Sequence, residues 1–148
     1  ANPGMLSSKL PIFQFCGGKI MMEDGRYDEA YATLFDAFKY YVDIGSARRI
    51  PCIKYMLMAN MLRPESAKID PFADPAISHM AQHAQVSPLA KLLKAFEENK
   101  INDFHKTLGA YPDDITSDPF LSQFIESLEQ KLRVQVVVEL IRPYTTIR

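Results

Sequence analysis

The sequence predicts an all-α protein in which antiparallel helix hairpins pack as a helical-repeat array. Apolar residues recur at three- and four-residue steps in several stretches, as they do on the buried face of a helix. Prolines stand where some stretches begin, and glycines stand where others end. One turn-and-helix pattern also returns in the second half of the chain. We therefore expect one helical-repeat domain over residues 1–148, with a long irregular connection at 63–87 inside it.

The composition is that of an ordinary globular protein, with 47% apolar and 24% charged residues in a chain of 148. A net charge of −1 does not supply the strongly basic face that nucleic-acid binding usually needs. No apolar run approaches the roughly 20 residues of a membrane-spanning helix, and the first ten residues do not have the pattern of a secretory signal. We expect neither nucleic acid nor a membrane among the partners.

The first two predicted helices form an antiparallel hairpin. Proline can open a helix at its first position, so we expect the first helix at 11–23. Asp24-Gly25 makes the turn, and a second helix at 26–44 ends before Gly45, which stands where helices commonly adopt a left-handed conformation. Gly17 and Gly18 interrupt the first helix, and close approach of a neighbouring helix is the simplest reason for them.

The turn of this hairpin resembles the junction of a tetratricopeptide-type repeat. A turn glycine is followed by an aromatic residue and then by small side chains that let two helices approach. A generic helix hairpin is the alternative. The spacing of Tyr27, Ala30 and Leu34 returns in Ile101, Phe104 and Leu108, which is near two repeat units later, with phenylalanine in place of alanine.

The middle of the chain alternates helices with breaks. We expect a third helix at 47–62 with Ser46 as its cap, and within the connection a short helix from Pro75 towards His83. Ser87-Pro88 should start a helix that ends near Asn99, and Asn102 should cap a short helix after it.

The closing helix is predicted at 118–142. Asp118 can accept hydrogen bonds from the first-turn amides, and Pro119 suits the first helical position. The stretch 134–141 is apolar nearly all round and rich in β-branched residues, so a strand is the alternative there. We favour a helix that continues into deep burial and ends at Pro143.

Candidate chemistry in this sequence is sparse. His79 and His83 would lie on one side of a helix, as metal-binding pairs do, but Met80 stands where a thermolysin-like site has its glutamate. We interpret the histidines as polar surface residues and expect no catalytic, cofactor-binding or metal-binding residue. A metal-dependent enzyme using His79, His83 and His105 is the alternative. For the two cysteines, Cys16 and Cys52, we expect buried reduced thiols rather than a disulfide or a reactive thiol.

One basic cluster, Arg48-Arg49, lies at the beginning of the third predicted helix. Positive charge there opposes the helix dipole. The two arginines could therefore contact acidic groups of a partner, although a solvated or internally paired face is the alternative.

A series of short motifs runs in order through nearly all of the chain after residue 14. They are Cys16-Gly17-Gly18-Lys19, Gly25-x-Tyr27-x-x-Ala30, Gly45-Ser46-x-Arg48-Arg49, Ala59-Asn60-Met61-Leu62, Ile69-x-Pro71-Phe72, Asp118-Pro119-Phe120 and Arg142-Pro143-Tyr144-Thr145. This series resembles the PCI-domain family, and within it the subunit-two branch of the COP-nine signalosome. The paralogous branch in the lid of the proteasome regulatory particle is the alternative.

The resemblance implies helical repeats followed by a winged helix that joins neighbouring subunits. It implies a noncatalytic scaffold subunit of a complex that removes a ubiquitin-like modifier from cullin–RING ubiquitin ligases (deneddylation), with the zinc isopeptidase on another subunit and no cofactor here. The implied partners are other signalosome subunits and a cullin–RING ligase bound through the full-length protein. The implied location is the cytoplasm and nucleus.

The family's winged helix would start near the last residues of this sequence, so we expect the natural chain to continue past Arg148. The apolar end of the closing helix should then be more exposed here than in the full protein, and the isolated chain could form a homodimer through it. The candidate partner-binding residues are Arg48, Arg49, Val137, Ile141 and Tyr144.

Overall fold

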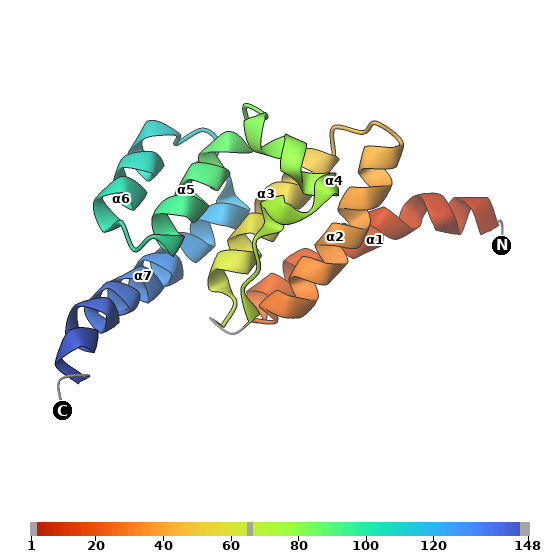
Figure 1. Cartoon of the computed structure of the whole chain (residues 1–148). Coiled ribbons are helices and arrows are strands. Elements are labelled where there is room, and N and C mark those ends of the chain that lie inside the picture. The colour runs from red at the N-terminus through yellow and green to blue at the C-terminus, as the bar shows by residue number, and fades with distance from the viewer. Residues whose placement is uncertain (1–2, 65–66, 146–148) are drawn as a thin grey trace. The chain divides into compact units, whose positions relative to one another are not determined.

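The computed structural model describes residues 3–64 and 67–145, and these residues form helices and connections without any strand. The elements, shown in Figure 1, are α1 (Pro3–Glu23), α2 (Tyr27–Asp43), α3 (Arg49–Leu62), η2 (Pro71–Ala73), α4 (Pro75–Ser78), η3 (His79–Gln82), α5 (Ser87–Glu97), α6 (Ile101–Ala110) and α7 (Pro119–Thr145). The predicted all-α class is confirmed. The chain divides into two compact units, Ala1–Ser87 and Pro88–Arg148.

In the first unit, α1 and α2 form the predicted hairpin and α3 packs beside α2 (Figure 1). Gly25 turns the chain with a φ of 77°, and the Arg26 amide donates to the Met21 carbonyl at 2.8 Å. Gly45 ends α2 in the same way at a φ of 67°. Both glycines occupy the left-handed region, which side chains with a Cβ seldom adopt, so both predicted turns are confirmed.

A close contact between α1 and α2 explains one of the two helix glycines. A Cβ atom on Gly18 would lie 2.6 Å from Leu34 Cγ, whereas one on Gly17 would meet nothing within 4 Å. Leu34 is itself fully buried. The predicted close approach is therefore found at Gly18, and nothing in the structure explains Gly17.

The first helix begins earlier than predicted. It runs from Pro3, with Pro11 inside it, so a start at Pro11 is wrong. Proline removes one helical hydrogen bond, but the ring of Pro11 is buried, and its packing offsets that loss.

The third helix is the core of the first unit. Every residue from Cys52 to Leu62 except Lys54 is buried. Three short helical turns then follow between Pro71 and Gln82, and the carboxylates of Asp70 and Asp74 cap the first two of them. The Asp74 Oδ1 atom accepts from the Ala76 amide at 2.8 Å, which confirms the predicted short helix at Pro75.

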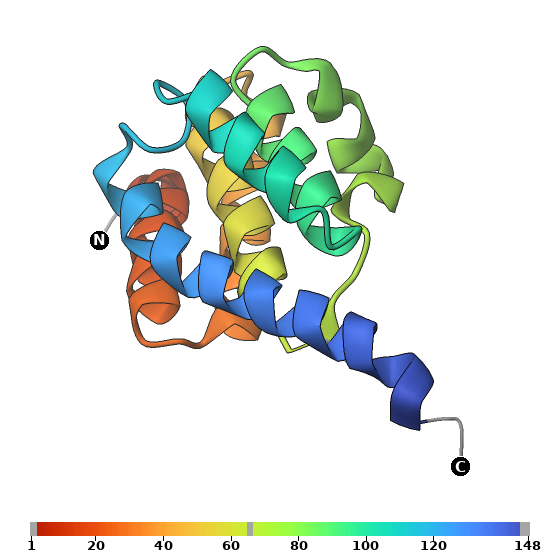
Figure 2. The same cartoon turned by 90° about the vertical axis from the view of Figure 1, so that its left-hand side faces the viewer.

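In the second unit, α5 and α6 form another hairpin, and they lie side by side in both views (Figures 1 and 2). Asn99 makes the turn in the left-handed region at a φ of 58°. The Lys100 amide donates to the Ala95 carbonyl at 2.9 Å, as the Arg26 amide does at the first hairpin. Because this turn sets the start of α6 at Ile101, Asn102 lies inside the helix, and its prediction as a cap is wrong.

The two hairpin turns therefore correspond residue by residue, as the repeated spacing predicted. Ala30 donates its amide to Arg26 at 2.9 Å, and Phe104 donates to Lys100 at the same distance. Ala30 and Phe104 are both fully buried. The larger side chain of the second copy thus takes an equivalent core position.

The closing helix α7 starts as predicted. Asp118 Oδ1 accepts from the Phe120 amide at 2.9 Å. Its first half buries one face: Phe120, Leu121, Phe124, Leu128 and Leu132. Pro143 lies inside the helix, which runs on to Thr145, so the predicted end at Pro143 is wrong. A proline this close to a helix end removes only one hydrogen bond. None of the helices within the described ranges has the length and hydropathy that crossing a membrane would require.

Candidate interaction surfaces

The second half of α7 is helical but exposed. The predicted helix over 134–141 is confirmed, whereas its predicted deep burial is wrong. The exposed fractions are 62% for Val134, 54% for Val137, 42% for Val138, 67% for Leu140 and 50% for Ile141. These five residues, which we call the α7 apolar face, lie on one helix at spacings that bring neighbouring side chains together.

Two of the predicted partner-binding residues, Val137 and Ile141, belong to this face. They are four residues apart and so lie on the same side of α7. Val134 and Val138 extend the same side. The side chain of Tyr144 lies outside the residues whose side chains are described. Contiguous exposed apolar surface on a protein commonly marks a contact site for another protein.

The structure separates the two predicted arginines. The Arg49 guanidinium turns back and donates to the Ser46 carbonyl at 2.8 Å. Arg48 is exposed and lines an apolar hollow of about 160 Å³ together with Ile12, Phe15, Tyr41 and Pro51. The Ser46 hydroxyl accepts from the Arg48 amide at 3.2 Å. Because α3 begins at Arg49 and Arg48 is its N-cap, without a side-chain hydrogen bond, the prediction of Ser46 as the cap is wrong. The Arg48 side chain is therefore exposed to solvent, whereas the Arg49 side chain forms a hydrogen bond within the turn before α3.

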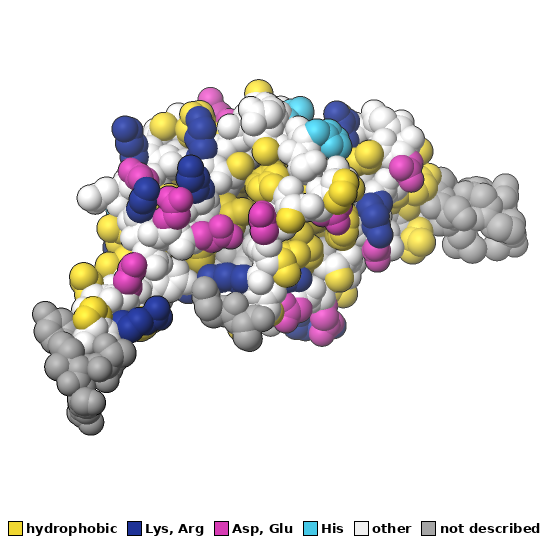
Figure 3. Space-filling view, in the orientation of Figure 1, with side chains coloured by type: hydrophobic (Ala, Val, Ile, Leu, Met, Phe, Trp, Pro, Cys, Tyr) yellow, Lys and Arg dark blue, Asp and Glu magenta, His cyan; other side chains and the backbone are white. Residues whose placement is uncertain are grey.

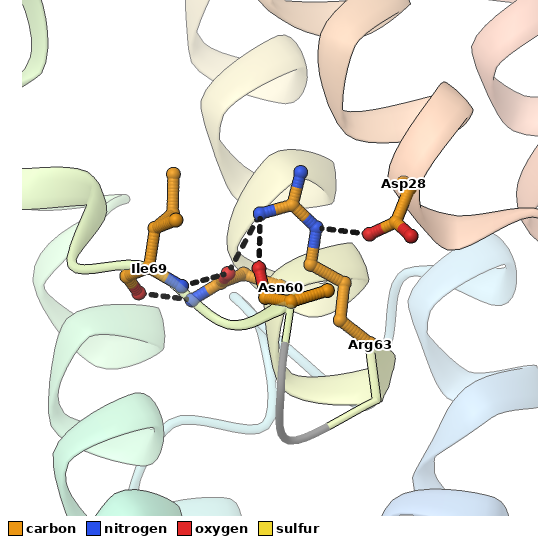
Figure 4. Close-up of polar contacts among 5 residues, drawn as sticks. Asp28, Asn60, Arg63 and Ile69 are labelled. Carbon is orange, nitrogen blue, oxygen red and sulfur yellow. Dashed lines mark hydrogen bonds and ion pairs between the residues drawn. The ribbon is translucent and has the colours of Figure 1, made fainter.

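A buried polar junction ties the connection after α3 to the first hairpin (Figure 4). Asn60 is fully buried, and its side-chain amide pairs with both backbone groups of Ile69. Its Nδ2 donates to the Ile69 carbonyl at 2.9 Å, and its Oδ1 accepts from the Ile69 amide at 3.3 Å. A single side chain thus replaces the backbone pairing that a neighbouring strand would provide.

Arg63 continues this junction towards α2. Its Nε atom lies 2.9 Å from Asp28 Oδ1, and its Nη1 donates to Asn60 Oδ1 at 3.3 Å. The guanidinium carbon stands 4.2 Å from the centre of the Tyr31 ring, a cation–π distance. Burial raises the pKa of Tyr31 to about 12, and the positive charge of Arg63 lowers it in part. The junction places a buried cation between an aromatic ring and a carboxylate, which fixes α2, α3 and the connection together.

Asn99 ties the second hairpin to α7. Its Oδ1 atom accepts from Gln135 Nε2 at 2.9 Å, and its Nδ2 donates to Glu139 Oε2 at 3.0 Å. Gln135 also reaches the Phe96 carbonyl at 3.4 Å. These contacts anchor α7 within the same stretch that carries the α7 apolar face.

The histidines do not share a helix face. His79 begins η3, and His83 follows its last residue as the C-cap, where the His83 Nδ1 atom accepts from the Gln85 amide at 3.1 Å. His105 Nε2 lies 3.4 Å from Glu129 Oε1 on α7. Within residues 3–64 and 67–145, no three His, Cys, Asp or Glu side chains are grouped as a metal site requires.

The two cysteines differ in exposure. Cys52 is fully buried, and burial raises the pKa of its thiol to about 12. Cys16 is exposed, so its predicted burial is wrong. Both are free thiols.

Comparison with known proteins relates the chain to one group of proteins. It is 37% identical over 133 residues to "COP9 signalosome complex subunit 2" of Caenorhabditis elegans, covering 90% of this chain. Proteins of the same description from Drosophila melanogaster and Schizosaccharomyces pombe are 34% and 33% identical, covering 92% and 93% of it. The chain is a relative of COP9 signalosome subunit 2. The predicted resemblance to the subunit-two branch is confirmed.

The relation concerns a part of each of these proteins. The chain spans 26% of the length of the Caenorhabditis elegans subunit 2 and 31% of that from Schizosaccharomyces pombe. No protein-family model matches the chain.

Sequence reasoning missed the residues that tie the elements together. Asn60 was taken only as part of a helix and of a family motif, Arg63 only as the first residue of the irregular connection, and Asn99 only as a helix end. Buried polar residue types within an apolar helix are a usable signal, because such groups are kept only where partners satisfy them. Asn60 stands among methionines and leucines and carries that signal.

Proposed function

We propose that this chain is part of a noncatalytic scaffold subunit of a signalosome-type complex. On this proposal the complex removes a ubiquitin-like modifier from cullin–RING ubiquitin ligases, and the isopeptidase chemistry belongs to another subunit. The observation that carries the proposal is the similarity to COP9 signalosome subunit 2 proteins over nine tenths of the chain. The proteasome-lid branch is disfavoured because the relatives reported above are all signalosome subunits.

The helical architecture supports a scaffold role. Hairpins whose turns repeat the same hydrogen bonds are the building unit of helical-repeat proteins, which commonly act by presenting extended surfaces. We further propose that the chain belongs to a PCI module and that the protein works in the cytoplasm and nucleus.

The α7 apolar face is the surface that we assign to assembly. Its side chains are 42–67% exposed on a helix that Asn99 and the buried first half hold in place. Valine, leucine and isoleucine side chains gain about 25 cal/mol for each Å² of apolar surface that a partner covers. Other signalosome subunits are the proposed occupants in the complex, and a second copy of the chain is the proposed occupant when it is isolated. A cullin–RING ligase is a proposed partner of the full-length protein.

The test is co-purification of the full-length protein with other signalosome subunits and with a cullin. The double variant Val137→Glu and Ile141→Glu places two carboxylates on the α7 apolar face. It should lose most of the co-purifying signalosome subunits while the protein still folds, since both side chains are about half exposed. Light scattering of the 148-residue chain should show a dimer for the parent and a monomer for the variant.

Gln130→Glu is the matched control, because Gln130 is an exposed polar residue of the same helix. It should co-purify with the same subunits as the parent protein. Retention of those subunits by the double variant would remove the α7 apolar face from the proposal. Co-purification of proteasome-lid subunits instead would overturn the assignment to a signalosome.

A further inference from the structure

The second unit carries a basic hollow between α5 and α6. Its walls include four lysines, Lys91, Lys94, Lys100 and Lys106, and two acidic residues, Glu98 and Asp103, around a volume of about 310 Å³. Lys91 and Lys94 are three residues apart on one side of α5, and Asp103 and Lys106 are three residues apart on one side of α6. Glu98 follows the last residue of α5. Figure 3 shows this gathering of dark blue side chains over α5 and α6.

The charges of the hollow are unbalanced. Four ammonium groups face two carboxylates there, although the chain as a whole has a net charge of −1. Lys100 Nζ lies 3.1 Å from Glu98 Oε2, and Lys91 Nζ donates to the Tyr111 hydroxyl at 2.7 Å. Lys94 and Lys106 have no ion pair among the described residues. Two exposed cations, one on each helix, thus remain available at the same hollow.

We infer that this hollow binds an acidic polypeptide segment. Carboxylates spaced along an extended peptide can meet Lys94 on one wall and Lys106 on the other, while peptide N–H groups donate to Glu98 and Asp103. A nucleic acid fits less well, because a continuous phosphate backbone would pass the two carboxylates. The lining residues described also include no aromatic side chain on which a base could stack.

The inference goes beyond the proposed function and uses a different surface. The lysines of α5 and α6 are not part of the α7 apolar face, so the variants that test one surface leave the other unchanged. If the hollow between α5 and α6 does not bind an acidic polypeptide, the scaffold proposal is unaffected. If the scaffold proposal fails, the binding of an acidic polypeptide to this hollow is likewise unaffected.

The experiment measures binding of a fluorescein-labelled peptide of about ten glutamates to the 148-residue chain by fluorescence anisotropy, at about 50 mM salt. The double variant Lys94→Glu and Lys106→Glu should bind at least about tenfold more weakly than the parent. The parent's affinity should also fall as salt is raised, because ion pairs at an exposed site are screened.

The matched control is Lys9→Glu with Lys39→Glu, which changes the net charge by the same amount at two exposed lysines of the first unit. It should bind the peptide within about twofold of the parent. Equal weakening by both double variants would overturn the inference, because net charge alone would then explain the binding. The inference would also be overturned if an oligodeoxythymidine bound the parent more tightly than the peptide does and bound the Lys94→Glu and Lys106→Glu double variant more weakly.

Two further measurements test whether small anions compete with the peptide and whether the double variant is folded. Inorganic phosphate at about the physiological ionic strength should not displace the peptide beyond the effect of chloride at equal ionic strength. Full displacement by phosphate alone would overturn the polypeptide assignment. Amide chemical-shift changes on peptide addition should concentrate in α5 and α6 of the parent and vanish in the double variant, whose unchanged remaining spectrum reports an intact fold.

Discussion

Asn99 and Gln135 are joined by a hydrogen bond of 2.9 Å, from Gln135 Nε2 to Asn99 Oδ1, across the space between the α5–α6 turn and α7. The same asparagine holds the left-handed turn at a φ of 58°. At the equivalent turn of the first hairpin stands Gly25, which adopts that conformation without a side chain. One residue of the second hairpin therefore combines the turn with an anchor for the closing helix.

Replacing Asn99 separates these two roles. Asn99→Gly keeps the left-handed turn and loses the side-chain hydrogen bonds, so it should lower the free energy of unfolding by about 1 kcal/mol. Asn99→Ala loses the hydrogen bonds and also strains the turn, which should add about 1 kcal/mol to the loss. Urea denaturation followed by circular dichroism measures both. Equal stability of the glycine and alanine variants would contradict the role of the turn.

Gly17 and Gly18 form a matched pair in α1. Gly17→Ala should raise the free energy of unfolding by up to about 1 kcal/mol, because alanine is the better helix former and a Cβ there meets nothing within 4 Å. Gly18→Ala should lower it by about 1–3 kcal/mol, because the new methyl group would overlap Leu34 Cγ, 2.6 Å away. Thermal denaturation of the two variants measures the difference. A stabilised Gly18→Ala would show that the contact between α1 and α2 is looser than described.

The Asn60 junction should be more important for stability than the Asp28 contact beside it. Asn60→Leu leaves both backbone groups of Ile69 without their side-chain partner, at a cost of about 1–3 kcal/mol. Asp28→Asn removes a carboxylate whose side chain is 59% exposed, so it should change stability by less than about 1 kcal/mol. Hydrogen exchange provides the specific readout: the Ile69 amide should exchange faster in Asn60→Leu only. An unchanged Ile69 exchange rate would rule out the pairing.

Stability should fall at alkaline pH. The pKa values of Tyr31 and Cys52 are both raised by burial to about 12 in the folded chain, from ordinary values of 10.0 and 9.0. Their contribution is therefore complete below about pH 9 and is lost as pH rises towards 12, because the unfolded chain ionises first. The free energy of unfolding should drop by about 2–4 kcal/mol by pH 11. The double variant Tyr31→Phe and Cys52→Ala should flatten this dependence, and a slope equal to the parent's would contradict it.

The two thiols should react at very different rates. Cys16 is exposed and Cys52 is fully buried, so a disulfide reagent should modify one thiol per native chain quickly. Cys52 should react only as the chain opens, in parallel with global unfolding. Cys16→Ser should abolish the fast phase, and two fast thiols in the parent would contradict the burial of Cys52.

The sequence was most informative where a residue acts on its own backbone. Asp118, Gly25 and Gly45 each affect the amides and carbonyls next to them, and their roles were predicted correctly. Local rules were wrong for Pro11, whose buried ring offsets one lost hydrogen bond, and for Pro143, which lies so close to the end of α7 that it removes only one.

The interaction surfaces were predicted in part. Val137 and Ile141 were identified because an apolar stretch extended past the amphipathic pattern of α7, although their exposure depends on what the rest of the chain covers. The Asn60–Ile69 pairing and the four lysines around one hollow depend on which elements fold side by side. Spacing along one helix contains no information on the neighbouring helix, so these groupings required the structure.

Beyond Arg133 no described side chain of α7 is fully buried, and a free helix of that length would be marginal in water. This part of α7 stays helical because the first half of the helix is buried and because Gln135 and Glu139 form hydrogen bonds with Asn99. A protein that covers the α7 apolar face would thus meet a helix already ordered, and would lose little conformational entropy on binding. Asn99, at the turn between α5 and α6, thereby lowers the entropic cost of assembly through the exposed half of α7.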